Sequence, residues 1–344
     1  MPLLCIVPAA PEGKQMTSKK GVLLLCLLLF LAMLLIPLAS LGGGGPGGES
    51  GSSGGGSLPK RAATGRQFLI RDTSAGKVLS VDDSAFLRGA IAAEMSPEAP
   101  PEALKAQGVA AYTYYSRIRE AKRKEAGSTS DFDADPVNWS VYVTDSEMKK
   151  RWGDSYQKYS GALDAAAKAV SGQVLQYGGQ LIDATYFAIS AGSTEDAADV
   201  WGSKCPYLVS VASPWDAFAG GCQTSASFSE SDFRARVQKA APKASFPASA
   251  DGWVGTVDRS SAGTVKTISV GGQSLTGGQI RTAFGLRSAN FTLAHANGQF
   301  VFTVKGYGHG VGMSQTGAEG MARQGASYRE ILSWYYPGTK LYSV

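Results

Sequence analysis

The sequence has little of the material from which several common functional sites are built. Its 344 residues include two histidines, His295 and His309, and four cysteines without a Cys-x-x-Cys pair. These numbers exclude a histidine-rich metal site and a disulfide-dense scaffold. Charged residues make up 18% of the chain, the formal net charge is +5, and no dense run of Lys and Arg is present. Charge therefore gives no reason to expect nucleic acid as a partner.

A long uncharged stretch is present instead. Residues 21–41 carry no charge and are mostly leucine, and as a helix they would span about 30 Å, the thickness of a bilayer core. A cleaved signal peptide is the alternative, but its apolar part would be only about 7–15 residues long. Lys14, Lys19 and Lys20 precede the stretch, and the next basic residue is Lys60. The positive-inside rule then predicts a cytoplasmic tail over residues 1–20, a transmembrane anchor and an extracytoplasmic remainder.

The residues after this stretch divide into a tether and a globular part. Residues 42–65 begin GGGGPGGESGSSGGGS, a composition that cannot bury a core and predicts a flexible linker. Residues 66–344 have enough apolar residues for one sizeable outer domain. Helical periodicity and capping predict early helices over residues 83–95, 101–124 and 159–171, and strand patterns dominate from residue 173 onward. We therefore predict an α+β fold with a mostly antiparallel β part.

Glu94 is the first candidate for a chemical role. It ends a predominantly apolar helix, and both apolar surroundings and the negative end of the helix dipole disfavour a carboxylate. These two effects predict a raised pKa, and a carboxyl group that is protonated near neutral pH can protonate a leaving oxygen. A solvated, frayed helix end is the alternative interpretation of the same pattern.

Two further segments could bind a ligand. The sequence from Ser190 through Thr194 to Glu195 ends a predicted strand, and its small hydroxyl residues near Trp201 would suit a sugar-binding groove; an ordinary turn is equally compatible with it. The other segment, GYGHGVGMSQTG over residues 306–317, has four alternating glycines that permit unusual backbone angles and close ligand approach. It lacks the Gly-Lys-Ser/Thr of a phosphate-binding loop.

These segments resemble, in the same order, the stage II sporulation protein D family, which also includes amidase-enhancer proteins. The resemblance lies in AAEM with EALKAQGVAAYTYYSR, in ISAGSTEDAADVWG with CPYLVSV and SPWD, and in GYGHGVGMSQTGAEGMARQGASYREILSWYYPGTKL. It covers most of residues 76–344, and the last piece is the most specific.

The resemblance implies a lytic transglycosylase that cleaves peptide-free peptidoglycan strands and leaves 1,6-anhydro-muramic ends, without a cofactor. Its partners would be the glycan strands, a cell-wall amidase or endopeptidase and a membrane scaffold, during engulfment or wall remodelling. The catalytic acid of the family corresponds to Glu94. One carboxyl group suffices, because the sugar's own 6-hydroxyl, rather than water, attacks the anomeric carbon. A non-catalytic glycan-binding subunit that enhances an amidase is the alternative function.

The remaining expectations concern individual residues. Tyr112 stands where the family usually has an arginine, so a substrate contact at this position would be altered. We expect Ser190, Thr194, Ser314 and Gln315 to bond substrate hydroxyls, together with Glu195, and His309 to hold the glycine-rich segment in shape. These side chains and Tyr112 form the predicted substrate-binding set, and together with Glu94 they would line one groove.

Cysteine and histidine placement gives the last two expectations. Some family members carry a zinc site after the long helix, but residues 125–200 contain neither Cys nor His, so we predict no metal. A zinc hydrolase built from His295, His309 and the two later cysteines would need four scattered ligands without metal spacing. Cys205 and Cys222 are the only cysteines expected outside the cytoplasm. They are therefore predicted to form a disulfide, with two free thiols as the alternative.

Overall fold

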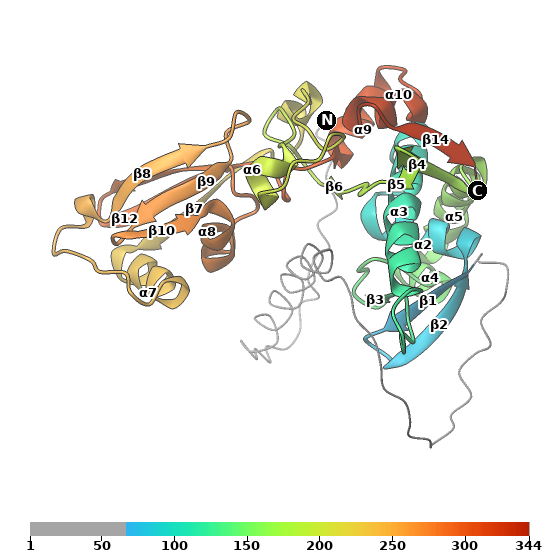
Figure 1. The fold of residues 1–344 in the computed structure, drawn as a ribbon, viewed down its shortest axis with the longest axis horizontal. Helices are drawn as coiled ribbons and strands as arrows, with labels where there is room; N and C mark the ends of the chain where they lie inside the picture. The colour runs from blue at the N-terminus through green and yellow to red at the C-terminus, as the bar shows by residue number, and fades with distance from the viewer. Residues whose placement is uncertain (1–66, 344) are drawn as a thin grey trace. The chain divides into compact units, whose positions relative to one another are not determined.

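The computed structural model describes residues 67–343, which belong to one compact unit, Pro59–Val344 (Figure 1). The predicted tail, anchor and linker of residues 1–65 lie outside the described residues. Within the described range, none of the helices combines the length and the apolar character needed to cross a bilayer. The described chain is a mixed α+β structure with antiparallel sheets, as the sequence predicts.

A first hydrophobic core is built from two stretches of chain, residues 67–222 and 306–343, which we call the helical region. Its helices α2, α3 and α5 contact one another, and α9 and α10 pack on α3. The elements of this region are β1 (Gln67–Asp72), β2 (Lys77–Asp82), α2 (Asp83–Glu94), α3 (Pro101–Lys122), β3 (Phe132–Ala134), α4 (Asp145–Trp152), α5 (Tyr156–Ala169), β4 (Gln173–Tyr177), β5 (Gln180–Leu181), β6 (Tyr186–Phe187), α6 (Ala197–Trp201), β13 (Met313–Ser314), α9 (Gln315–Arg323), α10 (Tyr328–Tyr335) and β14 (Lys340–Ser343).

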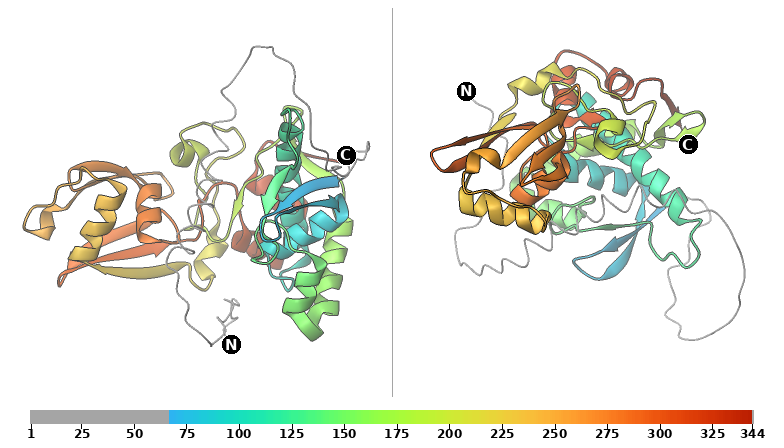
Figure 2. Two further views of the ribbon diagram at one scale, coloured as in Figure 1. Left: turned by 90° about the horizontal axis from the view of Figure 1, so that it is seen from below. Right: turned by 60° about the vertical axis from the view of Figure 1, so that its left-hand side comes forward.

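A second core lies entirely within residues 223–305, which we call the inserted region. Its two three-stranded antiparallel sheets have the orders β10-β9-β8 and β11-β12-β7, and helices α7 and α8 contact these strands (Figure 2). Its elements are β7 (Gln223–Ser229), α7 (Glu230–Ala240), β8 (Val254–Arg259), β9 (Val265–Val270), β10 (Gln273–Thr276), α8 (Gly277–Phe284), β11 (Phe291–Ala296) and β12 (Gln299–Lys305).

The chain enters and leaves the inserted region through paired strands. Gln223 at the start of β7 pairs with Lys305 at the end of β12, and the Gly306 N–H donates to the Cys222 carbonyl at 2.8 Å. The two ends of this insertion are therefore neighbours, which lets the helical region close across it. The sequence predicts one outer domain. Residues 67–343 lie within one compact unit, and this unit contains two hydrophobic cores, because the apolar residues of β7–β12 and α7–α8 pack on one another.

The predicted helices and strands agree best with the structure where local sequence signals, such as a capping residue or a proline, are strong. Helix α2 begins after Asp82, whose carboxylate accepts from the backbone N–H groups of Ser84 and Ala85. Helix α3 begins at Pro101 as predicted. Within the strand-rich part that begins at residue 173, residues 180–187 form two short strands, β5 and β6, of two residues each, because residues 182–185 leave the ladder between them.

Candidate active site

The candidate site is centred on Glu94, the last residue of α2. The helix buries Phe86, Leu87, Ala90 and Ile91 in the first core, so its direction is set by packing, and its C-terminal residue is held at the edge of that core. The Glu94 side chain is half-buried. This placement brings a carboxyl group into apolar surroundings at the negative end of a helix dipole.

Residues distant in the sequence contact this carboxyl group. Gln315, at the start of α9, donates from Nε2 to the Glu94 backbone carbonyl at 3.2 Å and to its Oε2 at 3.4 Å. The same amide lies 3.4 Å from Oε1 of the buried Gln107. The Tyr186 hydroxyl from β6 also donates to the Glu94 carboxylate, and Tyr115 is hydrogen-bonded to Tyr186. Two separate segments, β6 and the start of α9, therefore hold the acid, and Gln107 and Tyr115 of α3 support their side chains.

Burial raises the pKa of Glu94 to about 7, although the hydrogen bonds from Gln315 and Tyr186 act to lower it. The raised pKa agrees with the sequence prediction, and desolvation is its main cause. A carboxyl group with this pKa exists in both protonation states near neutral pH. It can therefore donate a proton in one step and accept one in the next.

The glycine-rich segment adopts the unusual backbone that the sequence predicts. Gly306, Gly308, Gly310 and Gly312 all have positive φ angles, between 78° and 117°. At Gly312 an added Cβ would lie 2.1 Å from the Thr185 carbonyl oxygen, so only glycine fits there. The residues that follow pair with β6 as the short parallel strand β13.

His309 holds this segment against β6. Its Nδ1 accepts from the Val311 N–H at 3.2 Å, and its ring donates to the Tyr186 backbone carbonyl. Burial, with a smaller effect from Arg281, lowers the pKa of His309 to about 4. The imidazole is therefore neutral at neutral pH, and both of its nitrogens are used in holding the loop, which supports the positioning role expected for it.

The predicted hydroxyl ligands converge on a buried acid instead of facing solvent. Ser190 Oγ donates to Asp216 Oδ2 at 2.5 Å, and Ser314 Oγ donates to Asp216 Oδ1 at 2.7 Å. All three residues are at most 3% exposed. Thr194 is also fully buried, and its Oγ1 accepts from the Val211 N–H at 2.9 Å. In this structure these hydroxyls tie the strand end to β13, and their contact with substrate stays a prediction.

Glu195 lies in a buried position. It is 3% exposed, its N–H donates to the Gly310 carbonyl at 2.7 Å, and its Oε2 has no hydrogen-bond partner among residues 67–343. It lines a cavity of about 20 Å³ with Ser193, Lys305 and His309. That volume admits roughly one water molecule, so a larger ligand requires the lining to move.

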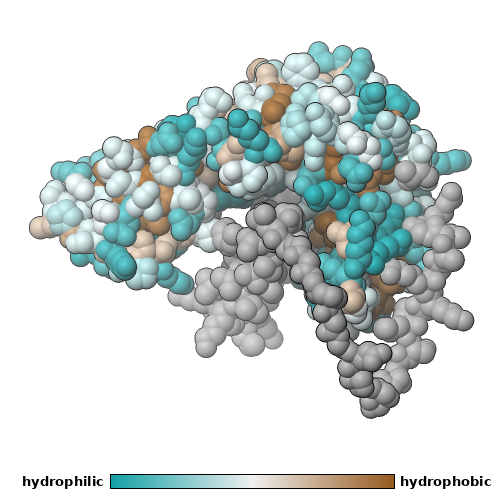
Figure 3. All heavy atoms as spheres, in the orientation of Figure 1, coloured by the Kyte–Doolittle hydropathy of each residue, from teal (hydrophilic) through white to brown (hydrophobic). Residues whose placement is uncertain are grey.

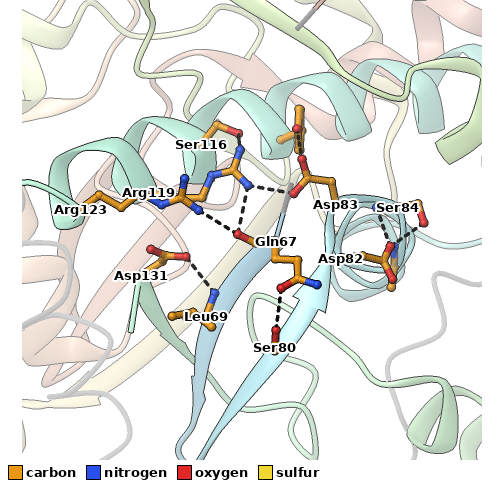
Figure 4. Close-up of polar contacts among 12 residues, drawn as sticks. Gln67, Leu69, Ser80, Asp82, Asp83, Ser84, Ser116, Arg119, Arg123 and Asp131 are labelled. Carbon is orange, nitrogen blue, oxygen red and sulfur yellow. Dashed lines mark hydrogen bonds and ion pairs between the residues drawn. The ribbon is translucent and has the colours of Figure 1, made fainter. Parts of the chain in front are cut away.

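Tyr112 does not join the site. Its hydroxyl donates to Asp83, the first residue of α2, whereas Glu94 is the last, and a helix of this length spans about 18 Å. Asp83 also accepts from Arg119 Nη1 at 2.8 Å, in the polar cluster that Figure 4 shows between α3 and β1. Tyr112 is 3% exposed. The structure thus places Tyr112 in a packing role at the other end of α2 and not at the substrate contact expected for it.

The predicted disulfide is not formed, because both cysteines are free in the structure. Each thiol has a different local partner. Cys205 is hydrogen-bonded to Tyr207, whereas Cys222 Sγ lies 3.5 Å from the Ala217 carbonyl oxygen, beyond the short 3₁₀ helix Pro214–Phe218. The disulfide is predicted from the expected compartment and the number of cysteines in it. Neither of these determines the geometry that a disulfide requires.

Other acids in the neighbourhood differ from Glu94. Burial acts to raise the pKa of Glu102, but hydrogen bonds from Lys105 and from the Tyr328 N–H outweigh it and lower the pKa. Burial raises the pKa of Glu319 on α9, against a hydrogen bond from Arg323. Among residues 67–343, no three His, Cys, Asp or Glu side chains are placed to hold a metal ion.

The fold and site define a class of protein: an α+β protein in which a half-buried carboxyl group at a helix end is held by a glycine-rich segment. The family model described as Stage II sporulation protein matches residues 71–177. A stage II sporulation protein D of Bacillus amyloliquefaciens is 36% identical over 273 residues, which cover 78% of this chain and 76% of that protein. The Bacillus subtilis (strain 168) protein of the same name is 35% identical over 257 residues, covering 74% and 73%. The chain belongs to the stage II sporulation protein D family, as the sequence motifs predict.

A relative with a different name also matches most of this chain. A protein of Bacillus subtilis (strain 168) named "Amidase enhancer" is 29% identical over 308 residues, which cover 75% of this chain and 40% of that protein. The family therefore includes a relative whose name describes stimulation of another enzyme.

Proposed function

We propose that the chain is a membrane-anchored lytic transglycosylase that cleaves peptidoglycan glycan strands, with Glu94 as its acid and base. The observation that carries this proposal is the position of the Glu94 carboxyl group, which lies at the end of α2 with Gln315 and Tyr186 against it, in surroundings whose burial raises its pKa to about 7. Membership in a sporulation family and similarity to an amidase enhancer support a cell-wall substrate.

The reaction needs one carboxyl group. Protonated Glu94 donates its proton to the glycosidic oxygen as the bond to the anomeric carbon breaks. The resulting carboxylate then takes the proton of the muramic acid 6-hydroxyl as that oxygen bonds to the anomeric carbon. A 1,6-anhydro ring and a free chain end result, and Glu94 is protonated again. Gln315 and Tyr186 hold the carboxyl group in place through both steps.

The other expected residues have supporting roles in this proposal. Gln315 contacts the sugar, while the buried Ser190, Thr194, Glu195 and Ser314 hold the backbone that lines the substrate. Residues 21–41 anchor the chain, and the described domain faces the wall. A membrane scaffold and an amidase act as partners.

The test is cleavage of peptide-free glycan strands by the full-length protein in detergent, with mass spectrometry to detect 1,6-anhydro-muramic ends. We expect Glu94→Gln to lower the rate by about 10² to 10⁴ or more while the melting temperature is kept. Glu102→Gln is the matched control, because it changes the same type of side chain and should leave the rate within a few-fold.

A glycan-binding subunit that enhances an amidase is the second candidate, favoured by the 29% identical relative of that name. If this is the function, the protein without substitutions should bind glycan and accelerate a cell-wall amidase without producing 1,6-anhydro ends. Full activity in Glu94→Gln would refute the assignment of Glu94.

A further inference from the structure

An acid that the proposed reaction does not use lies near the candidate site. Hydrophilic and neutral residues cover most of the face drawn in Figure 3, but Asp216 is fully buried, in the 3₁₀ helix Pro214–Phe218. Burial raises the pKa of Asp216, and hydrogen bonds from Ser190, Ser213 and Ser314 act to lower it. A buried carboxyl group disfavours folding unless such partners satisfy it, so these three hydroxyls determine where Asp216 can lie.

The three hydroxyls connect Asp216 to separate segments. Ser190 Oγ donates to Asp216 Oδ2 at 2.5 Å, and Ser314 Oγ donates to Oδ1 at 2.7 Å. Ser213 Oγ lies 2.6 Å from the hydroxyl oxygen of Tyr335 on α10. Ser314 is the N-cap of α9, and its side chain also accepts from a backbone N–H of the first turn. One carboxyl group therefore joins the strand end at Ser190, α10 and the start of α9.

Helix α9 packs directly on the segment that carries this acid. An added Cβ at Gly317 would overlap the Ser213 hydroxyl, and one at Gly320 would overlap Cβ of Trp215. Ser213 and Trp215 are close neighbours of Asp216 in the sequence. The two glycines therefore allow a contact between α9 and the 3₁₀ helix that is too close for any larger residue, and the first turn of α9 is held in place from this side.

The start of α9 is also the segment that contacts Glu94. Gln315 directly follows Ser314, and its Nε2 donates to the Glu94 carbonyl at 3.2 Å and to Glu94 Oε2 at 3.4 Å. The hydroxyl on Asp216 and the amide on Glu94 thus belong to adjacent residues, so a shift of one displaces the other. Resting on the proposed function, we infer that Asp216 is a positioning residue, which holds Gln315 against the Glu94 carboxyl group through Ser314.

The experiment measures the pKa of Glu94 in the full-length protein in detergent, by carbon NMR with glutamate labelled at its carboxyl carbon. Glu94→Gln identifies the signal, because that variant lacks it. Asp216→Asn keeps the size of the side chain but replaces one acceptor oxygen with an amide donor. It should raise the pKa of Glu94 by about half to one unit, because the hydrogen bond from Gln315 that lowers this pKa is weakened.

Two further variants test the route from Asp216 to Glu94. Ser314→Ala removes the same link without changing the buried acid, and should also raise the pKa of Glu94. Ser213→Ala is the matched control, because it removes a hydroxyl from the same carboxyl group on the side away from Gln315, and should leave that pKa unchanged. The titratable side chains that act on Glu94 or respond to it, Tyr186 of β6 and Tyr115 of α3, stay the same throughout.

A double variant separates positioning from a general loss of stability. Gln315→Ala should raise the pKa of Glu94 by itself, and Asp216→Asn should then add no further shift. A folded Asp216→Asn or Ser314→Ala protein with an unchanged Glu94 pKa, or a full additional shift in the double variant, overturns this inference and leaves the proposed function standing. Full cleavage activity in Glu94→Gln overturns the proposed function instead, and the NMR result does not depend on it. Melting temperatures report whether each variant is folded.

Discussion

The helical region and the inserted region are stabilised in different ways. The first core joins residues from both ends of the described chain, for example Phe86 with Ile331. The second core draws every member from residues 226–304, and six buried aromatic side chains, led by Phe233 and Phe300 with ring centres 3.9 Å apart, pack on one another there. The first core therefore depends on contacts between distant parts of the sequence, which its C-terminal helices complete. The second core depends on contacts within one continuous stretch of chain.

The candidate site belongs to only one of these regions. Glu94, Tyr186 and Gln315 all lie in the helical region, where long-range packing brings the end of α2, β6 and the start of α9 together at one carboxyl group. The inserted region lies in the sequence between β6 and α9, and its residues form a separate hydrophobic core. The site therefore depends on the packing of the first core.

The largest expected effect tests whether the second core is a separate cooperative unit. Phe300→Ala removes a fully buried ring from the stack on Phe233 and Trp253 and should destabilise the inserted region by about 3–5 kcal/mol. Hydrogen exchange should rise across residues 223–305 and stay low in α2 and α3. Val257→Ala, at an exposed position of β8, is the control and should change little. An equal rise in both regions would show that the two cores unfold together.

A smaller effect tests how the helical region is closed. Gly312 combines a φ of 84° with a Cβ position 2.1 Å from the Thr185 carbonyl oxygen, so Gly312→Ala must move β13 or β6. We expect a loss of about 3 kcal/mol in the free energy of unfolding. Gly325 has a φ of 93° but open space around it, so Gly325→Ala should cost about 1 kcal/mol. The denaturant midpoints of the two variants measure these losses. Equal losses of stability would show that the positive φ angle alone, and not the close Thr185 carbonyl, determines the cost.

The sequence predicts what local chemistry determines. Asp82 as a cap and Pro101 in a first turn locate α2 and α3, and the apolar end of α2 predicts the raised pKa of Glu94. The alternating glycines predict left-handed backbone angles, which the structure has. Each of these features depends on neighbours within a few residues.

Contacts between residues that are far apart in the sequence cannot be predicted from such local signals. Nothing near Tyr186 in the sequence shows that it meets Glu94, or that Gln107 and Tyr115 support the side chains that do. Gln315 contacts Glu94 across 221 positions. Ser190 and Ser314 were assigned to substrate, and only the structure shows Asp216 between them. The sequence does not reveal the second core for the same reason. Its strands pair with partners far along the chain, and periodicity does not show such pairings.

The smallest expected effect concerns the hydrogen bond that links β6 to the acid. Tyr186 donates to the Glu94 carboxylate and thereby lowers its pKa, so Tyr186→Phe should raise that pKa above 7 by about half to one unit. Carbon NMR titration of the Glu94 carboxyl measures this directly and does not depend on turnover. Tyr114→Phe is the control, because Tyr114 is on the neighbouring helix and interacts with Asp183 instead. An unchanged or lower pKa in Tyr186→Phe would mean that the hydroxyl does not stabilise the carboxylate, and Gln315 alone would hold it.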